Sequence, residues 1–423
     1  MVTVAAPAID YRSPAIRRGR AVLFAVCALC FILCQFSRSV TGVLGPSLRS
    51  ELGLSADEMG TLTGAFFWGI ALMQIPSGIL FDRYGARLTV AITLFAGVAG
   101  GLLFAFGESF VALTTGLFVL GLGTSAVFMG AVVLIAQWWP PDRFATLSAT
   151  MMSLGYLGNL AATEPFVWLM DWIGWRWGYA ASILGILLCA ILFLTAVRDA
   201  PRPPGATKRE PESLGTVVRG LGEIFRHPAF PGLAGAAFTS YSTNFAIRGL
   251  WIGLYMLDVH GLELAASGRM LLVMAVLGAA GIFLAGWLAG KLGSPRRVVM
   301  LFAGTSLCCL LTLALWPGMP TPALLAVLCV YGLFSNFFPA ILEHGRSLFD
   351  ERLRGRSLTS INVWVFVGVG VTQPITGFLM DSFAPVNGAP PEAAYRAMFG
   401  YLAAVIFCGV GLYLLLARFP RRP

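Results

Sequence analysis

The sequence predicts an all-α membrane protein whose twelve transmembrane helices form two related bundles of six. Of the 423 residues, 57% are hydrophobic and only 12% are charged, whereas a soluble protein of this length needs far more polar surface. Apolar runs of about 20 residues recur along the chain, the length that a helix needs to cross a bilayer core of about 30 Å. These runs do not alternate between apolar and polar residues as the strands of a β-barrel do.

The basic residues are distributed as in a membrane protein with both termini in the cytoplasm. With an even number of spans, 23 of the 29 Lys and Arg residues fall in segments expected on the cytoplasmic side, as the positive-inside rule requires. This placement explains the net charge of +9 without a nucleic-acid partner. Two arginines, Arg38 and Arg248, fall inside apolar segments. The four arginines expected outside are Arg49, Arg176, Arg269 and Arg396.

The elements are expected in a regular order, from a basic cytoplasmic tail at residues 1–20 to a cytoplasmic C-terminal tail at residues 418–423. The first bundle, residues 21–197, has spans near 21–45, 60–80, 88–106, 111–138, 145–170 and 177–197. A linker at 198–231, rich in proline and charge, is expected in the cytoplasm with a short amphipathic helix near 213–226. The second bundle, residues 232–417, has spans near 232–257, 268–290, 297–316, 322–345, 357–379 and 396–417.

The stretch GILFDRYGAR, Gly78 to Arg87, joins the second and third spans. Its spacing, G-x-L-x-D-R-x-G-x-R, resembles the signature loop of the major facilitator superfamily between transmembrane helices 2 and 3. A weaker copy begins 208 residues later at Gly286, and LGLSADEMG at 52–60 aligns with HGLELAASG at 260–268 at the same shift. The resemblance implies two six-helix halves with a binding site between them near the middle of the membrane.

The resemblance also implies a mechanical role for this loop. Asp82 and Arg83 would form charge-assisted bonds across the cytoplasmic seam when the transporter faces outward, and Gly78, Gly85 and Arg87 complete the predicted gating set. A tight glycine turn that obeys the positive-inside rule would explain the arginines without gating, but it would not explain Asp82.

Arg38 and Arg248 are the strongest functional candidates, because a charge inside a membrane is costly unless it is paired or faces a cavity. They lie at near-equivalent levels of spans 1 and 7, and a guanidinium can bind two carboxylate or phosphate oxygens at once. We therefore expect both to face one central cavity and to bind an anionic substrate. Paired arginines in these spans resemble the organophosphate:phosphate antiporters and the anion:cation symporters. Alternatively, the two arginines pair with protein groups or lipid headgroups and never contact substrate.

Other polar residues share helix faces with these arginines or lie in spans 5, 10 and 11. Tyr241 and Asn244 precede Arg248 by seven and four residues, and Gln35 shares a face with Arg38. The predicted substrate-binding residues are Arg38, Arg248, Gln35, Tyr156, Asn159, Tyr241, Asn244, Asn336 and Asn362. Each uncharged member, taken alone, could instead form an interhelical hydrogen bond.

Glu164 is the acidic residue predicted to lie deepest in the membrane, and it has two interpretations. It could be a titratable group that couples transport to protons, because desolvation raises the pKa of a carboxyl and a nearby arginine lowers it. It could equally be the fixed partner of an arginine. Span 5 lacks the histidine expected from the resemblance to organophosphate antiporters, so carboxylates and phosphate esters both remain open as substrates.

The sequence therefore predicts a secondary transporter for a small organic anion, monomeric, in a bacterial cytoplasmic membrane. Coupling to a proton, coupling to sodium and exchange all remain open. The eight cysteines fall within spans without disulfide or zinc spacing, and no cofactor, metal site or catalytic grouping is expected. The alternatives are a drug or metabolite exporter of the same superfamily and a non-transporting membrane sensor on the same scaffold.

Overall fold

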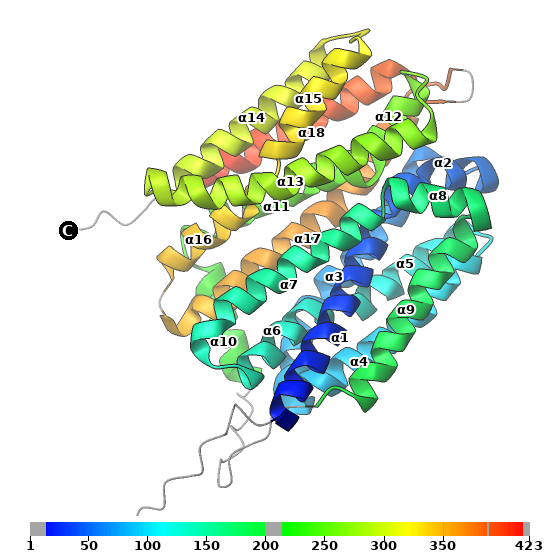
Figure 1. Cartoon of the computed structure of the whole chain (residues 1–423). Coiled ribbons are helices and arrows are strands. Elements are labelled where there is room, and N and C mark those ends of the chain that lie inside the picture. Colours follow the sequence, from blue (N-terminus) through cyan, green and yellow to red (C-terminus); the bar gives the residue numbers. More distant parts are fainter. Residues whose placement is uncertain (1–13, 199–213, 350, 387–388, 418–423) are drawn as a thin grey trace, which may run out of the picture.

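The computed structural model describes residues 14–198, 214–349, 351–386 and 389–417, and the regular structure of these residues is helical apart from one isolated β-bridge between Val386 and Ala389. The first half contains α1 (Pro14–Ser39), α2 (Thr41–Leu52), α3 (Ala56–Tyr84), α4 (Ala86–Phe106), α5 (Phe110–Thr124), α6 (Ala126–Trp138), α7 (Pro141–Ala161), α8 (Glu164–Ile173) and α9 (Trp175–Thr195). The second half contains α11 (Phe230–Ala246), a π-helical turn (Ile247–Trp251), α12 (Ile252–Asp258), α13 (Leu264–Leu292), α14 (Pro295–Leu315), α15 (Thr321–Phe334), α16 (Phe338–Leu348), α17 (Glu351–Asp381) and α18 (Glu392–Leu416). The two halves lie side by side (Figure 1).

These helices account for the twelve predicted spans, so the predicted all-α membrane architecture is confirmed. Ten helical segments of the described chain are long and apolar enough to cross a membrane. The other two predicted spans, 145–170 and 232–257, correspond to α7–α8 and to α11–α12, which are interrupted. One further helix, α10 (Leu214–Phe225), lies inside the predicted linker.

Several spans are broken where the sequence places proline or a polar residue. Pro165 is the second residue of α8, and it lacks the N–H that would continue the hydrogen-bond ladder from α7. Pro339 occupies the same position in α16, so α15 and α16 are separated in the same way. Span 7 is interrupted differently, because the chain passes through the π-helical turn without leaving the helix.

The halves meet most closely along α3 and α17. A Cβ built at Gly60 of α3 would lie 2.4 Å from the carbonyl oxygen of Gln373, and one built at Gly377 of α17 would lie 2.4 Å from that of Ala56. Glycine therefore lets the two backbones approach each other, as small residues do at helix interfaces in membranes.

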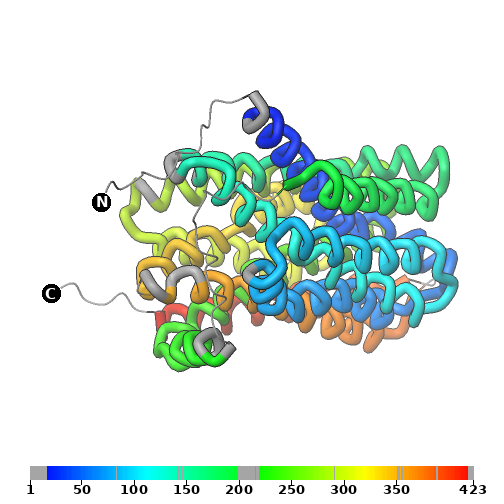
Figure 2. The backbone as a smooth tube through the Cα atoms, turned by 90° about the horizontal axis from the view of Figure 1, so that it is seen from below, coloured from blue at the N-terminus to red at the C-terminus, as the bar shows by residue number. Residues whose placement is uncertain are grey.

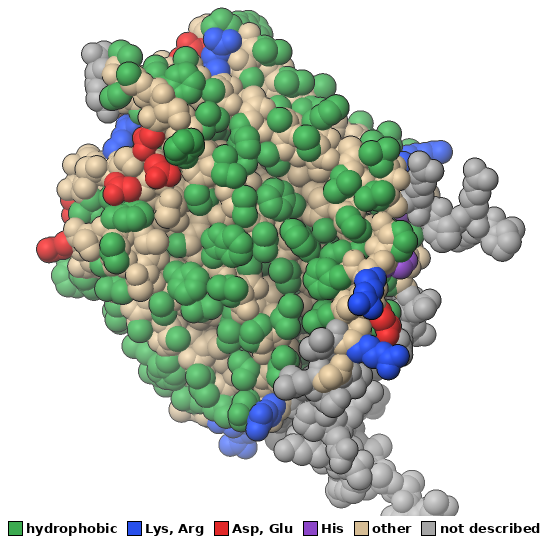
Figure 3. All heavy atoms as spheres, turned by 180° about the vertical axis from the view of Figure 1, so that it is seen from behind, with side chains coloured by type: hydrophobic (Ala, Val, Ile, Leu, Met, Phe, Trp, Pro, Cys, Tyr) green, Lys and Arg blue, Asp and Glu red, His purple; other side chains and the backbone are tan. Residues whose placement is uncertain are grey.

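The first described helix begins, and the last described helix ends, on the same side of the molecule (Figure 2). We call the opposite side, where α2, α8 and α12 lie (Figure 1), the far end. On the face shown in Figure 3, hydrophobic side chains cover the middle and charged side chains gather toward the two ends. Trp168, Trp172 and Trp177, at the far end, are all more than half exposed, as interfacial tryptophans of membrane proteins are.

Candidate functional site

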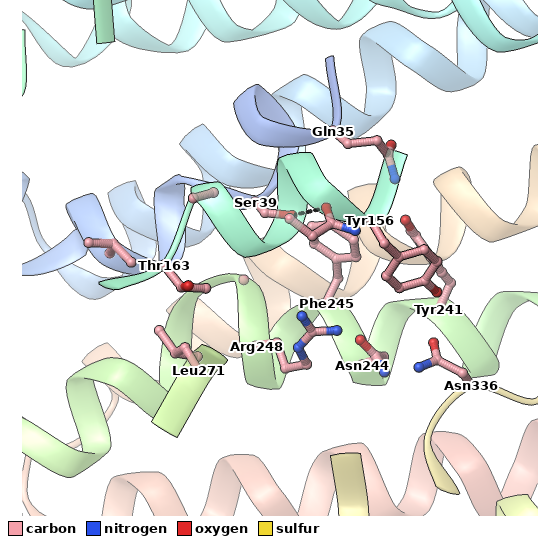
Figure 4. Close-up of a pocket in the computed structure, with 14 residues that line it drawn as sticks. Gln35, Ser39, Tyr156, Thr163, Tyr241, Asn244, Phe245, Arg248, Leu271 and Asn336 are labelled. Carbon is pink, nitrogen blue, oxygen red and sulfur yellow. Dashed lines mark hydrogen bonds between the residues drawn. The ribbon is translucent and has the colours of Figure 1, made fainter. Parts of the chain in front are cut away.

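A pocket lies between the two halves, and each half supplies seven of its lining residues. The first half contributes Gln35, Ser39, Val43, Tyr156, Asn159, Ala162 and Thr163, and the second contributes Tyr241, Asn244, Phe245, Arg248, Gly249, Leu271 and Asn336. Ten of these residues are labelled in Figure 4. The pocket therefore combines one cation with amides, hydroxyls and a small apolar surface.

The polar groups of the pocket are held by neighbouring helices. The hydroxyl of Ser39 donates to Oδ1 of Asn159 at 2.7 Å, which links α1 to α7. The amide of Asn244 donates to the hydroxyl of Ser335 at 2.5 Å, and the amide of Asn336 donates to the carbonyl of Gly278 at 3.2 Å. Because each amide keeps further donor and acceptor capacity, these side chains are oriented but not saturated.

Arg248 is the only charged residue among those that line this pocket. It lies on the π-helical turn, and its guanidinium points into the space between the halves (Figure 4). Its Nε is shielded from solvent and has no hydrogen-bond partner among the described residues. The guanidinium lies beside Gly278 of α13, where a Cβ would meet the Nη1 atom of Arg248 at 3.6 Å, an ordinary van der Waals distance. A charged group whose Nε is shielded from solvent and lacks a partner is costly, and an anion would reduce that cost.

Arg38 and Asn362 are predicted site residues that do not line this pocket. The guanidinium of Arg38 lies 5.4 Å from the ring centroid of Phe366 on α17. Around α1, Arg38 points about 100° from Ser39 and about 60° from Gln35, and of these three residues only Gln35 and Ser39 line the pocket. The amide of Asn362 donates to Oε1 of Gln74 at 3.3 Å, a contact between α17 and α3.

Glu164 begins α8 beside the pocket residue Thr163, and its partner is an arginine of the other half. Its carboxylate lies 3.6 Å from the guanidinium of Arg269 on α13, and the Glu164 side chain is 13% exposed. A Cβ at Gly268 would lie 3.3 Å from Cα of Glu164, so the two backbones are close as well. The arginine that pairs with Glu164 is therefore neither Arg38 nor Arg248. Glu164 lies at the helix break and toward the far end, where Arg269 is the neighbouring arginine.

The predicted gating residues lie where α3 turns into α4, and the side chain of Asp82 falls outside the described residues. Gly85 has a positive φ of 84°, which favours glycine at this turn. The guanidinium of Arg83 lies 5.6 Å from the ring centroid of Tyr84. Arg87 donates to the carbonyls of Phe193, at 3.0 Å, and Leu194 at the end of α9, within the same half. Among the described residues, no atom lies within 4 Å of where a Cβ at Gly78 would be.

Contacts at the far end join the two halves, and the sequence interpretation did not anticipate them. Arg49 of α2 and Asp258 of α12 form two hydrogen bonds of 2.7 and 2.5 Å, and the hydroxyl of Tyr395 donates to the same carboxylate at 2.6 Å. The carboxylate of Asp381, at the end of α17, accepts hydrogen bonds of 3.0 and 2.8 Å from the first backbone N–H groups of α3. We call these contacts the far-end seal. Arg49 and Asp258 are 209 residues apart, close to the repeat of 208, and that near-equivalence was a usable signal.

Comparison with known proteins agrees with this geometry. The family model described as Major Facilitator Superfamily matches residues 27–342. The chain is similar to a probable galactarate/D-glucarate transporter of Bacillus subtilis, with 22% identity over 88% of each chain. It is also similar to a D-galactonate transporter of Escherichia coli O6:H1, with 24% identity over 94% of this chain and 96% of that one. Among solved structures, an inward-facing, unoccupied bacterial homologue of the human lysosomal transporter Spinster superposes with a TM-score of 0.78 and 18% identity, covering 96% of this chain and 99% of that one.

Proposed function

The chain belongs to the Major Facilitator Superfamily, and from that premise we propose that it is a secondary transporter that carries a sugar acid, or a similar small organic anion, by alternating access. The observation that carries this proposal is Arg248, a guanidinium in the pocket between the halves with no ion-pair partner among the described residues. The two relatives named above are a probable galactarate/D-glucarate transporter and a D-galactonate transporter, and these three sugar acids are carboxylates that carry several hydroxyl groups.

The chemistry of the pocket fits such a ligand. A guanidinium donates two parallel hydrogen bonds to a carboxylate, and the amides of Asn159, Asn244 and Asn336 can donate to hydroxyl oxygens and accept from hydroxyl hydrogens. Polar contacts from both halves would let a bound anion draw the halves together, so that binding energy favours closure around the substrate.

Orientation and coupling complete the proposal. Most of the basic residues that the structure describes lie at the end where α1 begins and α18 ends, so we place that end in the cytoplasm and the far end outside. The far-end seal then corresponds to a state that is closed to the outside. Glu164 remains the candidate coupling group, because protonation would weaken its ion pair with Arg269 across the two halves. Asp82, Arg83 and the glycines of their loop remain the candidate inner gate.

Uptake into proteoliposomes tests the function. The purified protein should take up D-galactonate or D-glucarate, and a hexose phosphate offered in parallel decides between carboxylates and phosphate esters. We expect Arg248→Ala to lower uptake by about a hundredfold, since an anion then loses a shielded charged partner. Arg248→Lys should recover only part of it, because the planar fork is missing.

The matched control is Arg219→Ala, which removes an arginine from α10 whose side chain is 86% exposed. It should transport like the wild type. Uptake that survives charge reversal at Arg248 would contradict the anion site and favour an exporter with an apolar cavity. If the wild-type protein binds a sugar acid in calorimetry but transports none, the result would favour a non-transporting membrane sensor.

A further inference from the structure

The turn that carries Arg248 has an uncommon backbone. Residues Ile247–Trp251 form a π-helical turn between α11 and α12. Such turns insert an extra residue into a helix, disturb its regular hydrogen-bond ladder and recur at functional sites. The direction in which Arg248 points therefore depends on whether this turn stays in the π form, since the loss of one residue of register would rotate its side chain by about 100°.

The first half of the chain packs directly against the backbone of this turn. A Cβ built at Gly42 of α2 would lie 2.6 Å from the carbonyl oxygen of Arg248, and one built at Gly253 would lie 3.0 Å from the carbonyl oxygen of Gly42. The hydroxyl of Thr41, which is 5% exposed, donates to the carbonyl of Gly249 at 3.2 Å. One half thus supplies a hydrogen-bond donor to the π turn of the other half.

The last residue of the same turn is held by contacts within the second half. The indole of Trp251 is fully buried and donates to the hydroxyl of Thr376 on α17 at 2.7 Å. The hydroxyl of Thr376 in turn donates to the carbonyl of Gln373 at 2.8 Å. The end of the turn is therefore anchored, and the part that can change when the halves separate is the part that Thr41 and Gly42 contact.

We infer that Thr41 and Gly42 are positioning residues, which hold the π turn and so keep the guanidinium of Arg248 in the pocket while the far end is closed. When the halves part at the far end, α2 leaves the turn and the carbonyl of Gly249 loses the hydrogen bond that Thr41 donates to it. The side chain of Arg248 then loses its fixed direction. The inference rests on the proposed function and adds to it a physical link between the far-end seal and affinity for the anion. Linkage requires that the bound anion stabilises the seal by the same factor by which the seal improves anion binding.

Gly42→Ala tests the link, with Gly304→Ala as the matched control. Gly304 is an exposed glycine of α14, and no neighbouring atom lies within 4 Å of where its Cβ would be. We expect Gly42→Ala to weaken D-galactonate binding, measured by calorimetry on the purified protein, on the order of tenfold relative to Gly304→Ala. Thr41→Val, which removes the hydroxyl, should also weaken binding. Thr41→Ser, which keeps the hydroxyl, should bind D-galactonate like the wild type.

Hydrogen exchange of the segment 245–256 supplies a readout that needs no ligand. We expect faster exchange in Gly42→Ala than in Gly304→Ala, because the altered contact frees the turn. Unchanged exchange would overturn the inference whether or not any sugar acid binds. If the wild type binds D-galactonate and Gly42→Ala binds it equally well, the inference also fails while the proposed function stands. If the wild type binds no sugar acid but exchange responds as expected, the proposed substrate fails and the positioning role stands.

Discussion

Arg38 and Arg248 occupy near-equivalent positions in the two halves, yet their side chains have different surroundings. Arg248 lies on a π turn and lines the pocket between the halves. Arg38 lies on the regular helix α1, and its guanidinium sits over the ring of Phe366 instead. Repeat equivalence therefore indicates the level of a residue along its span, but not the direction in which its side chain points.

A second pair of near-equivalent positions, just beyond the ends of these two spans, carries opposite charges instead of like charges. Arg49 and Asp258 lie about three turns beyond the two arginines, carry opposite charges and contact each other across the halves. The pair at the far end neutralises itself, whereas the pair in the middle of the membrane consists of two cations. That difference is why we propose a seal at one level and an anion site at the other.

The largest effect that would sharpen this comparison is a difference in affinity between the two arginine variants. In calorimetry with D-galactonate, we expect Arg248→Ala to weaken binding about a hundredfold, the loss of a shielded charged contact. Arg38→Ala should weaken it less than tenfold, because its guanidinium acts on the pocket only through the longer-range field. Equal losses would break the comparison and would mean that Arg38 enters the pocket when substrate binds.

The next effect concerns the pair at the far end. Arg49→Ala would leave the carboxylate of Asp258, whose side chain is 4% exposed, with the hydroxyl of Tyr395 as its one partner among the described residues. We expect a loss of about 2 kcal/mol in the stability of the closed far end. The measurement is labelling of a cysteine placed at Ser47 on α2 by a membrane-impermeant reagent, which should become faster.

The exchanged pair, Arg49→Asp with Asp258→Arg, controls for this experiment. It restores opposite charges at the same positions and should slow the labelling again. Labelling at the wild-type rate in Arg49→Ala would show that Asp381 and the close packing of α3 against α17 hold the far end without this ion pair.

Most of the fold could be predicted from the sequence, because hydropathy and span length are set by the bilayer. The interruptions at Pro165 and Pro339 also have local causes. The π turn does not: Ile247–Trp251, IRGLW, has no proline and no composition that separates it from an ordinary helix. The residues that contact this turn from the other half, Thr41 and Gly42, lie about 200 residues away in the chain.

The candidate site was predicted unevenly for the same reason. Helical spacing placed Tyr241, Asn244 and Arg248 on one face, and all three line the pocket. For Arg38, spacing fixed its relation to Gln35, but the face that α1 turns toward the second half depends on how the helices pack. A pairing between Glu164 and Arg269 joins a helix break in one half to a helix start in the other, and no pattern in a single sequence relates those two positions.

The smallest effect tests what holds Arg38 away from the pocket. If the ring of Phe366 holds the guanidinium, then Arg38→Ala and Phe366→Leu should be less than additive in thermal unfolding, with a coupling energy of about 0.5–1 kcal/mol, the size of a cation–π contact. The control cycle pairs Arg38→Ala with Phe302→Leu, which alters a fully buried ring of α14 that packs against Phe334. Distant sites should be additive within about 0.5 kcal/mol. Equal coupling in both cycles would mean that Phe366 has no particular hold on Arg38. In that case the π turn alone would account for the different surroundings of the two guanidinium groups. A variant that fixes or releases this turn would then be the only way to give them similar surroundings.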